Sequence, residues 1–333
     1  MSRIPKRFYK KYSEKLSFRY IPNHSQFQYG YLGITESYVS GILELHFPSD
    51  NPIHAKQIDI TLIGMEYVCW KEKRHKKTIT HVVRNPLISQ GICVWNSPDD
   101  NYQPLTELQF PFRFELPDNL PSSVNFSREF SEIFYDLKAT IKQESNILKF
   151  RGSTKSIIIR CPITRYSLPP TIPTPTQFSN YDDPSAISRG IGFFVSLEHY
   201  VFSELIPISI DFGLLFHKPD LEIKEIILGV KQYVRLIAGK EKRLKNYILK
   251  SVVKYNEIKN RLDSNNEYKA NVKFEIPSRC DKKNYSVKHS VDMNYIKVSH
   301  KIKFKVKFGI FGGRYINWEK DIKIENMITE DLI

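Results

Sequence analysis

The sequence predicts an all-β protein built from two tandem, immunoglobulin-like antiparallel β-sandwiches. The first observation is an internal repeat, since three short blocks of the first half return in the second half in the same order and at nearly the same separation. The paired blocks are 60–68 with 226–234, 114–117 with 274–277, and 133–141 with 296–304. The second observation is length, because 333 residues suit two domains of roughly 150 residues each better than one core. A repeated fold also argues against a single buried active site.

Apolar and polar residues alternate with a period of two along many segments, which is the pattern of a β-strand with one buried face. In 110–116, three phenylalanines and Leu116 share one face, and Pro111 lies on the other. Because proline cannot donate a hydrogen bond to a sheet ladder, this strand is expected at a sheet edge or beside a bulge. Residues 133–141 and 226–236 alternate similarly, whereas the prolines of 117–121 predict a turn.

The domain boundaries follow from a change in composition. Segment 168–185 is rich in Pro, Thr and Asp and has no periodicity, which predicts a semi-stiff, partly polyproline II spacer. The predicted organisation is a first β-sandwich over 1–168, a Pro-rich linker over 169–189 and a second β-sandwich over 190–333.

Segment 244–262 departs from the strand pattern. It has an apolar residue at every third or fourth position, as in an amphipathic helix, with lysines on the other faces. It is either a basic helix that lies on a membrane or a strand–loop–strand region whose alternation is blurred. The second interpretation is favoured because helices are scarce elsewhere.

The composition indicates a globular protein with an acidic partner. Hydrophobic residues make up 41% of the chain, and the formal net charge is +14, which favours phosphorylated protein, anionic lipid or nucleic acid as partners. Solvated surface lysine explains this charge equally well.

The motif content predicts a cytoplasmic protein without catalytic residues. The N-terminus has no apolar signal segment, and the four cysteines have no metal-ligand spacing, so neither a metal nor a cofactor is predicted. The sequence has no phosphate loop, GxSxG or HExxH motif, and its nine histidines are scattered. A hidden enzymatic site is therefore not expected.

Several blocks carry a resemblance to a known family. The first half contains LQFPFRFELPDNLPSSV (108–124), IFYDLKATI (133–141) and SIIIRCPITRY (156–166). The second half contains IKEIILGVKQYVRL (223–236) and YIKVSHKIKFKVKFGIF (295–311). These blocks resemble the N- and C-terminal domains of arrestin-like proteins, and the resemblance covers nearly all of the chain. The fold of that family, two tandem β-sandwiches, is the one that the internal repeat predicts.

The resemblance implies a non-catalytic adaptor in endocytosis, protein transport and signal transduction. Such an adaptor binds phosphorylated or acidic cytoplasmic tails of membrane proteins, is recruited to the plasma membrane or endosomes, and brings a trafficking coat or a ubiquitin ligase. The short stretch between Asp100 and Phe110 leaves little room for the helix of visual and β-arrestins, which places the chain closer to α-arrestins. The sequence has no PPxY motif, however, so the ligase recruitment typical of α-arrestins lacks its usual signal.

Basic segments are candidate sites for a phosphorylated or acidic partner, because phosphate carries close to two negative charges and suits paired cations. Near the first strand, the resemblance points by region to Lys10, Lys11 and Lys15, and Arg19 of the same basic segment is a further candidate. In the second half, alternate lysines share one face of a predicted strand: Lys297, Lys301, Lys303, Lys305 and Lys307. A third basic segment, KEKRHKK (71–77), is predicted as a loop. The alternatives are a frayed terminus and lysines that are merely solvated or deter edge pairing.

Two other functions remain open at this point. One is a membrane-surface or coat scaffold of the same fold, comparable to the arrestin-like subunit of retromer, which would bind anionic lipid or a coat partner regardless of phosphorylation. A true helix over 244–262 would favour it. The other is nucleic-acid binding, which is disfavoured because the aromatic residues lie on the apolar strand faces and not among the lysines, where base stacking needs them.

Overall fold

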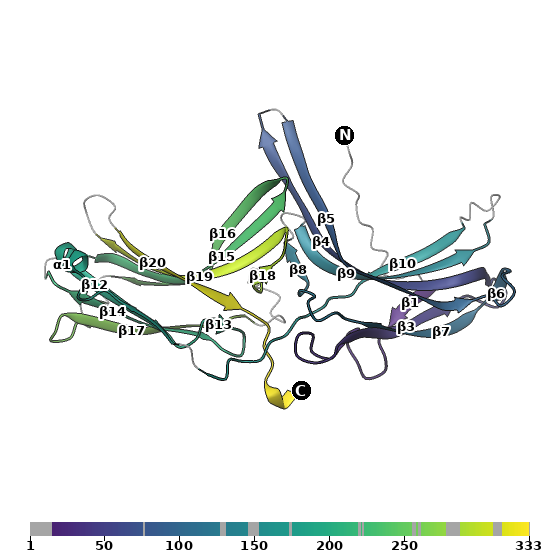
Figure 1. Ribbon diagram of the computed structural model, residues 1–333, viewed down its shortest axis with the longest axis horizontal. Helices are drawn as coiled ribbons and strands as arrows, with labels where there is room; N and C mark the ends of the chain where they lie inside the picture. The colour runs from purple at the N-terminus through teal and green to yellow at the C-terminus, as the bar shows by residue number, and fades with distance from the viewer. Residues whose placement is uncertain are drawn as a thin grey trace. The chain divides into compact units, whose positions relative to one another are not determined.

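The protein divides into two compact units, Met1–Arg165 and Tyr166–Ile333, in this computed structural model. Each unit consists of β-sheets arranged in two layers (Figure 1). Strand makes up 64% of the structure and helix 3%, which confirms the predicted all-β fold of two domains. The residues that the structure describes are 15–75, 77–126, 131–145, 153–172, 175–218, 221, 223–254, 258, 261–277, 287–308 and 315–332.

The first unit has a four-stranded and a six-stranded sheet, and all of its strand pairs are antiparallel. In the smaller sheet, β3 (Tyr38–His46) pairs with β1 (Leu16–Arg19), β2 (Gln28–Tyr29) and β7 (Glu107–Glu115). The larger sheet has the order β10-β9-β4-β5, with β6 beside β4 and β8 beside β9. Its strands are β4 (Ile53–Arg74), β5 (Lys77–Asn96), β6 (Gln103–Leu105), β8 (Val124–Phe126), β9 (Ser131–Gln143) and β10 (Thr154–Arg160).

The alternation predicted for 110–116 is confirmed in β7. Phe112 and Phe114 are buried, whereas Arg113 between them is exposed. Pro111 lies opposite Ile42 of β3, and β3 is the strand with which β7 pairs in the described part of the chain. Pro111 is therefore in an edge strand, where its missing N–H costs no ladder hydrogen bond.

Gly64 on β4 has no room for a side chain. A Cβ atom there would lie 2.6 Å from Cγ2 of Ile88 and 2.6 Å from Cε1 of Tyr135. The Tyr135 ring cannot move aside easily, because it is fully buried and its hydroxyl donates to the Pro121 carbonyl over 2.8 Å. We expect Gly64→Ala to destabilise the first unit by about 1–3 kcal/mol in chemical denaturation. Gly91→Ala is the matched control, since its nearest neighbour would be 3.7 Å away; equal losses in both variants would contradict the packing argument.

The second unit repeats the arrangement of the first. Its smaller sheet, in the order β11-β12-β14-β17, consists of β11 (Thr176–Ser179), β12 (Ile191–Leu197), β14 (Ile208–Phe216) and β17 (Glu267–Phe274). The larger sheet has the order β13-β20-β19-β15-β16, with β18 beside β19. Its strands are β13 (Val201–Phe202), β15 (Ile223–Ala238), β16 (Lys240–Lys254), β18 (Val291–Asp292), β19 (Ile296–Phe308) and β20 (Tyr315–Ile324). A short 3-10 helix, η2 (Glu330–Leu332), follows.

The repeated sequence blocks occupy corresponding strands of the two units. Block 60–68 lies in β4, between β9 and β5, and block 226–234 lies in β15, between β19 and β16. Leu62 of β4 is opposite Leu137 of β9, and Leu228 of β15 is opposite Phe304 of β19. The sequence repeat therefore marks a duplicated β-sandwich.

Aromatic rings join the two sheets of the second unit. The Phe304 ring of the larger sheet lies 5.3 Å from the Phe193 ring and 5.5 Å from the Phe212 ring, both of the smaller sheet, measured between ring centroids. All three side chains are almost completely buried. They form the centre of an apolar core between the layers.

The Pro-rich segment is more ordered than its composition predicted. Within 169–189, β11 pairs with β12, and a short helix, α1 (Pro184–Arg189), follows. Asp183 accepts a hydrogen bond from the Ser185 N–H over 2.7 Å, and Gly190 ends the helix at a φ of 87°. The division between the units comes earlier, after Arg165, because Ser167 already donates to the Asn326 carbonyl of the second unit over 2.9 Å.

The start of segment 244–262 is strand and not helix. Strand β16 continues to Lys254, which confirms the strand interpretation as far as that residue. The helix-like spacing comes from a β-bulge, since Val230 lies opposite Leu249 and Lys231 opposite Tyr247, which leaves Ile248 as an extra residue. The extra residue shifts the alternation by one position. In the described part of the chain, no helix is long and apolar enough to span a membrane.

Candidate anion-binding face

The lysine ladder lies on the outer face of β19, as the alternation predicted. The apolar residues between the lysines, from Val298 to Val306, are buried on the opposite face. Strand β19 is internal to its sheet, between β15 and β20. Protection of an exposed sheet edge therefore does not explain these lysines.

Acidic side chains of the same unit neutralise most of the ladder. The ion pairs are Lys297–Asp292 (2.6 Å), Lys301–Asp321 (3.3 Å), Lys303–Glu319 and Lys307–Glu225. The hydrogen bond from Lys307 lowers the pKa of Glu225, so this carboxylate is held in its charged form. The Lys305 ammonium lies 4.0 Å from the centroid of the Tyr315 ring. The ladder is thus a mixed row in which most cations already have an anion.

Positive charge is in excess beside the ladder, on β15 and β16. The Lys231 ammonium of β15 lies 4.3 Å from the centroid of the Tyr247 ring of β16. Burial, and then the charges of Lys303, Lys245 and Lys305, lower the pKa of Lys231, whereas the charge of Glu319 raises it. Three lysines and one glutamate thus act on Lys231, and an anion bound there would raise its pKa.

A groove opens on the same face, toward the end of the sheet where β15 turns into β16. Its volume is about 850 Å³. The basic side chains of its lining are Arg235, Arg243, Lys245, Lys297, Lys301 and Lys323, and the acidic ones are Asp292, Asp321 and Glu325. The groove shares Lys297 and Lys301 with the ladder and Lys245 with the surroundings of Lys231, and we call these three parts together the basic face. Arg235 and Arg243 are paired with Glu241, but basic side chains still outnumber acidic ones in the lining, which suits an acidic ligand.

The N-terminal candidates belong to the first unit and do not form such a surface in the described residues. Lys10 and Lys11 lie outside those residues. Lys15 precedes β1, with its ammonium 5.9 Å from the centroid of the Phe47 ring. Arg19 at the end of β1 pairs with Glu44 of β3 over 3.0 Å. The charge of Arg19 is therefore already compensated.

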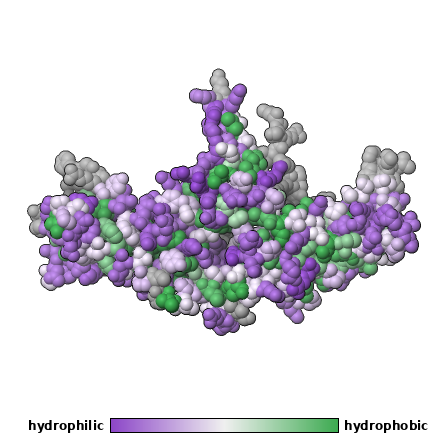
Figure 2. All heavy atoms as spheres, in the orientation of Figure 1, coloured by the Kyte–Doolittle hydropathy of each residue, from purple (hydrophilic) through white to green (hydrophobic). Residues whose placement is uncertain are grey.

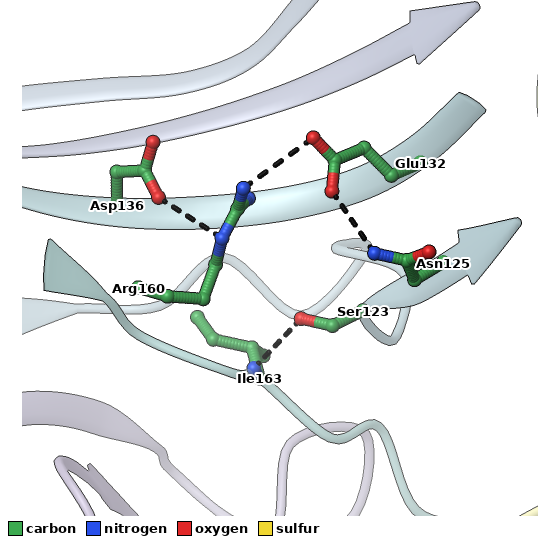
Figure 3. Close-up of polar contacts among 6 residues, drawn as sticks. All are labelled: Ser123, Asn125, Glu132, Asp136, Arg160 and Ile163. Carbon is green, nitrogen blue, oxygen red and sulfur yellow. Dashed lines mark hydrogen bonds and ion pairs between the residues drawn. The ribbon is translucent and has the colours of Figure 1, made fainter. Parts of the chain in front are cut away.

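Arg160 forms a polar cluster in the first unit that no sequence pattern indicated (Figure 3). Its guanidinium contacts Glu132 and Asp136 of β9, each over 3.3 Å, and lies 4.1 Å from the Phe134 ring centroid. Asn125 of β8 donates to Glu132 over 3.4 Å. The cluster depends on the pairing of β10 with β9, which places Arg160 opposite Asp136. The cluster contains two carboxylates and one guanidinium, so an anion would have to displace a carboxylate to bind Arg160.

The basic segment 71–77 is mostly strand, which corrects its prediction as a loop. Residues 71–74 end β4 and Lys77 begins β5, so the segment is the tip of a hairpin that extends beyond the sheet (Figure 1). Glu72 accepts from Arg74 over 2.7 Å and contacts His81 over 3.0 Å, and His81 stacks on Trp70. Figure 2 shows hydrophilic side chains over most of the extended hairpin. Its charges are thus partly paired with one another.

The described residues contain no group of three or more His, Cys, Asp or Glu side chains that could hold a metal ion. The Cys161 thiol is completely buried, and burial together with the charge of Asp136 raises its pKa to about 12. This thiol is therefore protonated at neutral pH and is a poor nucleophile.

Comparison with known proteins agrees with the duplicated β-sandwich. Residues 34–161 match the family described as arrestin (or S-antigen), N-terminal domain, and residues 194–329 match the corresponding C-terminal domain family. An arrestin domain-containing protein of Schizosaccharomyces pombe is 26% identical over 119 residues, which are 34% of this chain and 20% of that protein. The chain thus aligns with only a fifth of this relative's length. From the two domain matches, in the order that the fold requires, the chain belongs to the arrestin family.

Proposed function

We propose that the chain is a non-catalytic adaptor in protein transport that binds phosphorylated or acidic cytoplasmic tails of membrane proteins. The observation that carries the proposal is the basic face of the second unit, whose groove is lined by more basic than acidic side chains. Membership of the arrestin family supports an adaptor or scaffold role in trafficking. The adaptor would work from the cytoplasm, at the plasma membrane or endosomes. Ubiquitin-ligase recruitment would need a signal other than PPxY, which the sequence lacks.

The chemistry of the basic face fits a phosphorylated tail. A phosphate monoester carries close to two charges at neutral pH and accepts hydrogen bonds from several cations at once. Lys231 and Lys245 supply two ammonium groups on neighbouring strands, beside the hydroxyl-bearing ring of Tyr247. The groove next to them is lined by residues of β15, β16, β18, β19 and β20, including Lys245.

Removing the two central charges tests the site. We expect Lys231→Gln with Lys245→Gln to lower the affinity for a phosphorylated tail peptide about tenfold or more, because each charge-assisted hydrogen bond contributes about 1.5–3 kcal/mol. Fluorescence anisotropy at low and physiological salt would measure it, with the unphosphorylated twin peptide as reference. Lys142→Gln, an exposed lysine of the first unit, is the matched control.

The same titration distinguishes the two candidate regions. If the double variant binds normally and replacing Lys10, Lys11 and Lys15 with Gln abolishes binding, the site is the N-terminal segment and not the basic face. If neither peptide binds the parent protein at physiological salt, the adaptor proposal is wrong.

A membrane-surface scaffold is the second candidate, favoured by the same excess of cations on an open sheet face. In that case the basic face would meet anionic headgroups, and phosphorylation of a tail would not matter. Co-sedimentation with anionic and neutral vesicles checks this candidate. Vesicle binding that is unaffected by competing phosphopeptide would replace the tail-binding proposal.

A further inference from the structure

Strand β16 forms a long, open edge of the larger sheet in the second unit. It has 15 residues, and in the described part of the chain it pairs with β15 on one side and with no strand on the other. Among the other edge strands, β5 is interrupted by Pro86 and β7 by Pro111, whereas the proline-free β17 and β10 are about half as long as β16, with eight and seven residues. A proline-free edge of this length presents a row of backbone groups that can pair with an added strand.

The side chains of β16 determine which strand can pair there. Its basic residues are Lys240, Lys242, Arg243, Lys245, Lys250 and Lys254, and its acidic residue is Glu241. A second copy of β16 would bring the same cations against them, and directly opposed like charges are destabilising in a strand pair. An acidic extended segment would bring opposite charges. The charge pattern therefore selects against pairing between copies and for an acidic partner.

The second half of β16 adds a finer pattern. Lys250, Val252 and Lys254 occupy alternate positions, so their side chains lie on one side of the strand. This is the side of the sheet on which the basic face lies. Val252 is 39% exposed, so this row presents an apolar side chain between its two lysines. An added strand would match this row with an acidic residue, an apolar residue and a second acidic residue at alternate positions, roughly 6.6 Å apart.

We infer that β16 is a strand-addition site for an extended acidic segment of a partner protein, in which acidic and apolar residues alternate on one face. The inference rests on the proposed adaptor function and names where and how the tail would bind. Backbone hydrogen bonds to the β16 edge hold the segment. Ion pairs between its carboxylates and the ammonium groups of Lys250 and Lys254 make binding specific for an acidic sequence. Its acidic side chains farther along would meet Lys245, which lines the groove, whereas the neighbouring Arg243 is already paired with Glu241.

The test uses the full chain and two peptides of equal charge. One fluorescein-labelled peptide repeats Glu-Thr-Val-Thr, and its twin repeats Glu-Pro-Val-Pro, which keeps the carboxylates but removes every second backbone N–H and favours polyproline II over an added strand. We expect the first peptide to bind and to slow hydrogen–deuterium exchange of the amides of 240–254, and the second to do neither. Lys250→Glu with Lys254→Glu should weaken binding of the first peptide about tenfold, because reversing both charges turns two attractive cross-strand pairs into repulsive ones. Lys269→Glu with Lys273→Glu on β17 is the matched control, since β17 is a basic edge strand of the other sheet.

Each contrary outcome overturns the inference in a recognisable way. Equal binding of both peptides without protection of β16 would show a purely electrostatic surface. Binding that survives Lys250→Glu with Lys254→Glu would place the tail elsewhere and leave the adaptor function intact. Binding of anionic vesicles in the absence of any peptide binding would overturn both the strand-addition site and the tail-binding function.

Discussion

Replacing Phe304 with alanine is expected to destabilise the second unit by about 3–5 kcal/mol, the usual cost of removing a fully buried phenylalanine from a core. Phe304 is completely buried on β19 and contacts Phe193 and Phe212 of the opposing sheet. The cavity would lie between the two sheets, where neither can collapse without disturbing its own ladder. Differential scanning calorimetry should show a lower melting temperature for the second unit.

Phe304→Leu is the matched control, because it keeps most of the apolar volume and should cost less than half as much. The first unit provides an internal reference, since Phe304 belongs entirely to the core of the second unit. A loss of similar size in both variants, or a melting transition that does not change, would contradict the role of Phe304 in joining the sheets.

Acid is expected to destabilise the second unit through His300, which is completely buried on β19. The Ser290 hydroxyl lies 3.0 Å from Nδ1, and the Gln232 Oε1 atom lies 3.3 Å from Nε2. Ser290 accepts from the Ile324 N–H, so its own proton is available for Nδ1; Gln232 Oε1 is an acceptor, so Nε2 carries the ring proton. The neutral imidazole therefore accepts a hydrogen bond at Nδ1 and donates one at Nε2. If Nδ1 were protonated, it could no longer accept from the Ser290 hydroxyl, and this hydrogen bond would be lost.

Burial lowers the pKa of His300 to about 4, partly offset by a hydrogen bond to the Lys288 backbone. An unfolded histidine has a pKa of about 6.5. As the pH falls below about 6.5, this histidine is protonated in the unfolded chain but stays neutral in the folded chain. The contribution of His300 to stability is therefore complete above about pH 6.5 and is lost progressively down to about pH 4. The difference corresponds to about 3 kcal/mol.

The measurement is the free energy of unfolding of the second unit at several pH values between 4 and 7, with urea as denaturant. His300→Gln should flatten the pH dependence over this range, whatever its effect on stability at pH 7, because glutamine does not titrate. His54→Gln, an exposed histidine of the first unit, should leave the dependence unchanged. If the slope of the unfolding free energy against pH is the same in His300→Gln, the buried imidazole is not the group that causes the pH dependence.

The candidate site was predictable only in part. Alternation placed Lys301, Lys303 and Lys305 on one face of a strand, and the structure confirms that placement. Alternation could not show that Glu319 and Glu225, from the two flanking strands, pair with the ladder. The order of strands in a sheet depends on pairing between distant segments and cannot be read from one strand. For the same reason Lys231, where cations remain in excess, was not a candidate.

The Arg160 cluster shows the same limit in the first unit. Asp136 could be placed on the polar face of its strand by alternation, but its partner Arg160 is brought opposite by the antiparallel pairing of β9 and β10. The signal that could have pointed to it is an arginine near the end of an otherwise apolar run, IIIR (157–160). That signal alone does not specify a carboxylate partner.

The sequence by itself determined the all-β class and the duplicated sandwich, and it limited Pro111 to a sheet edge or a bulge, because hydrophobic alternation, internal repetition and the missing N–H of proline are properties of short segments. Tertiary structure alone decided three other features. Pairing with β12 turned 176–179 from spacer into strand, and a bulge at Ile248 made a strand look helical. Strand order then selected which cations of the second unit are neutralised and which remain in excess. Each of these depends on contacts between segments that are distant in sequence, which local propensity and periodicity do not encode.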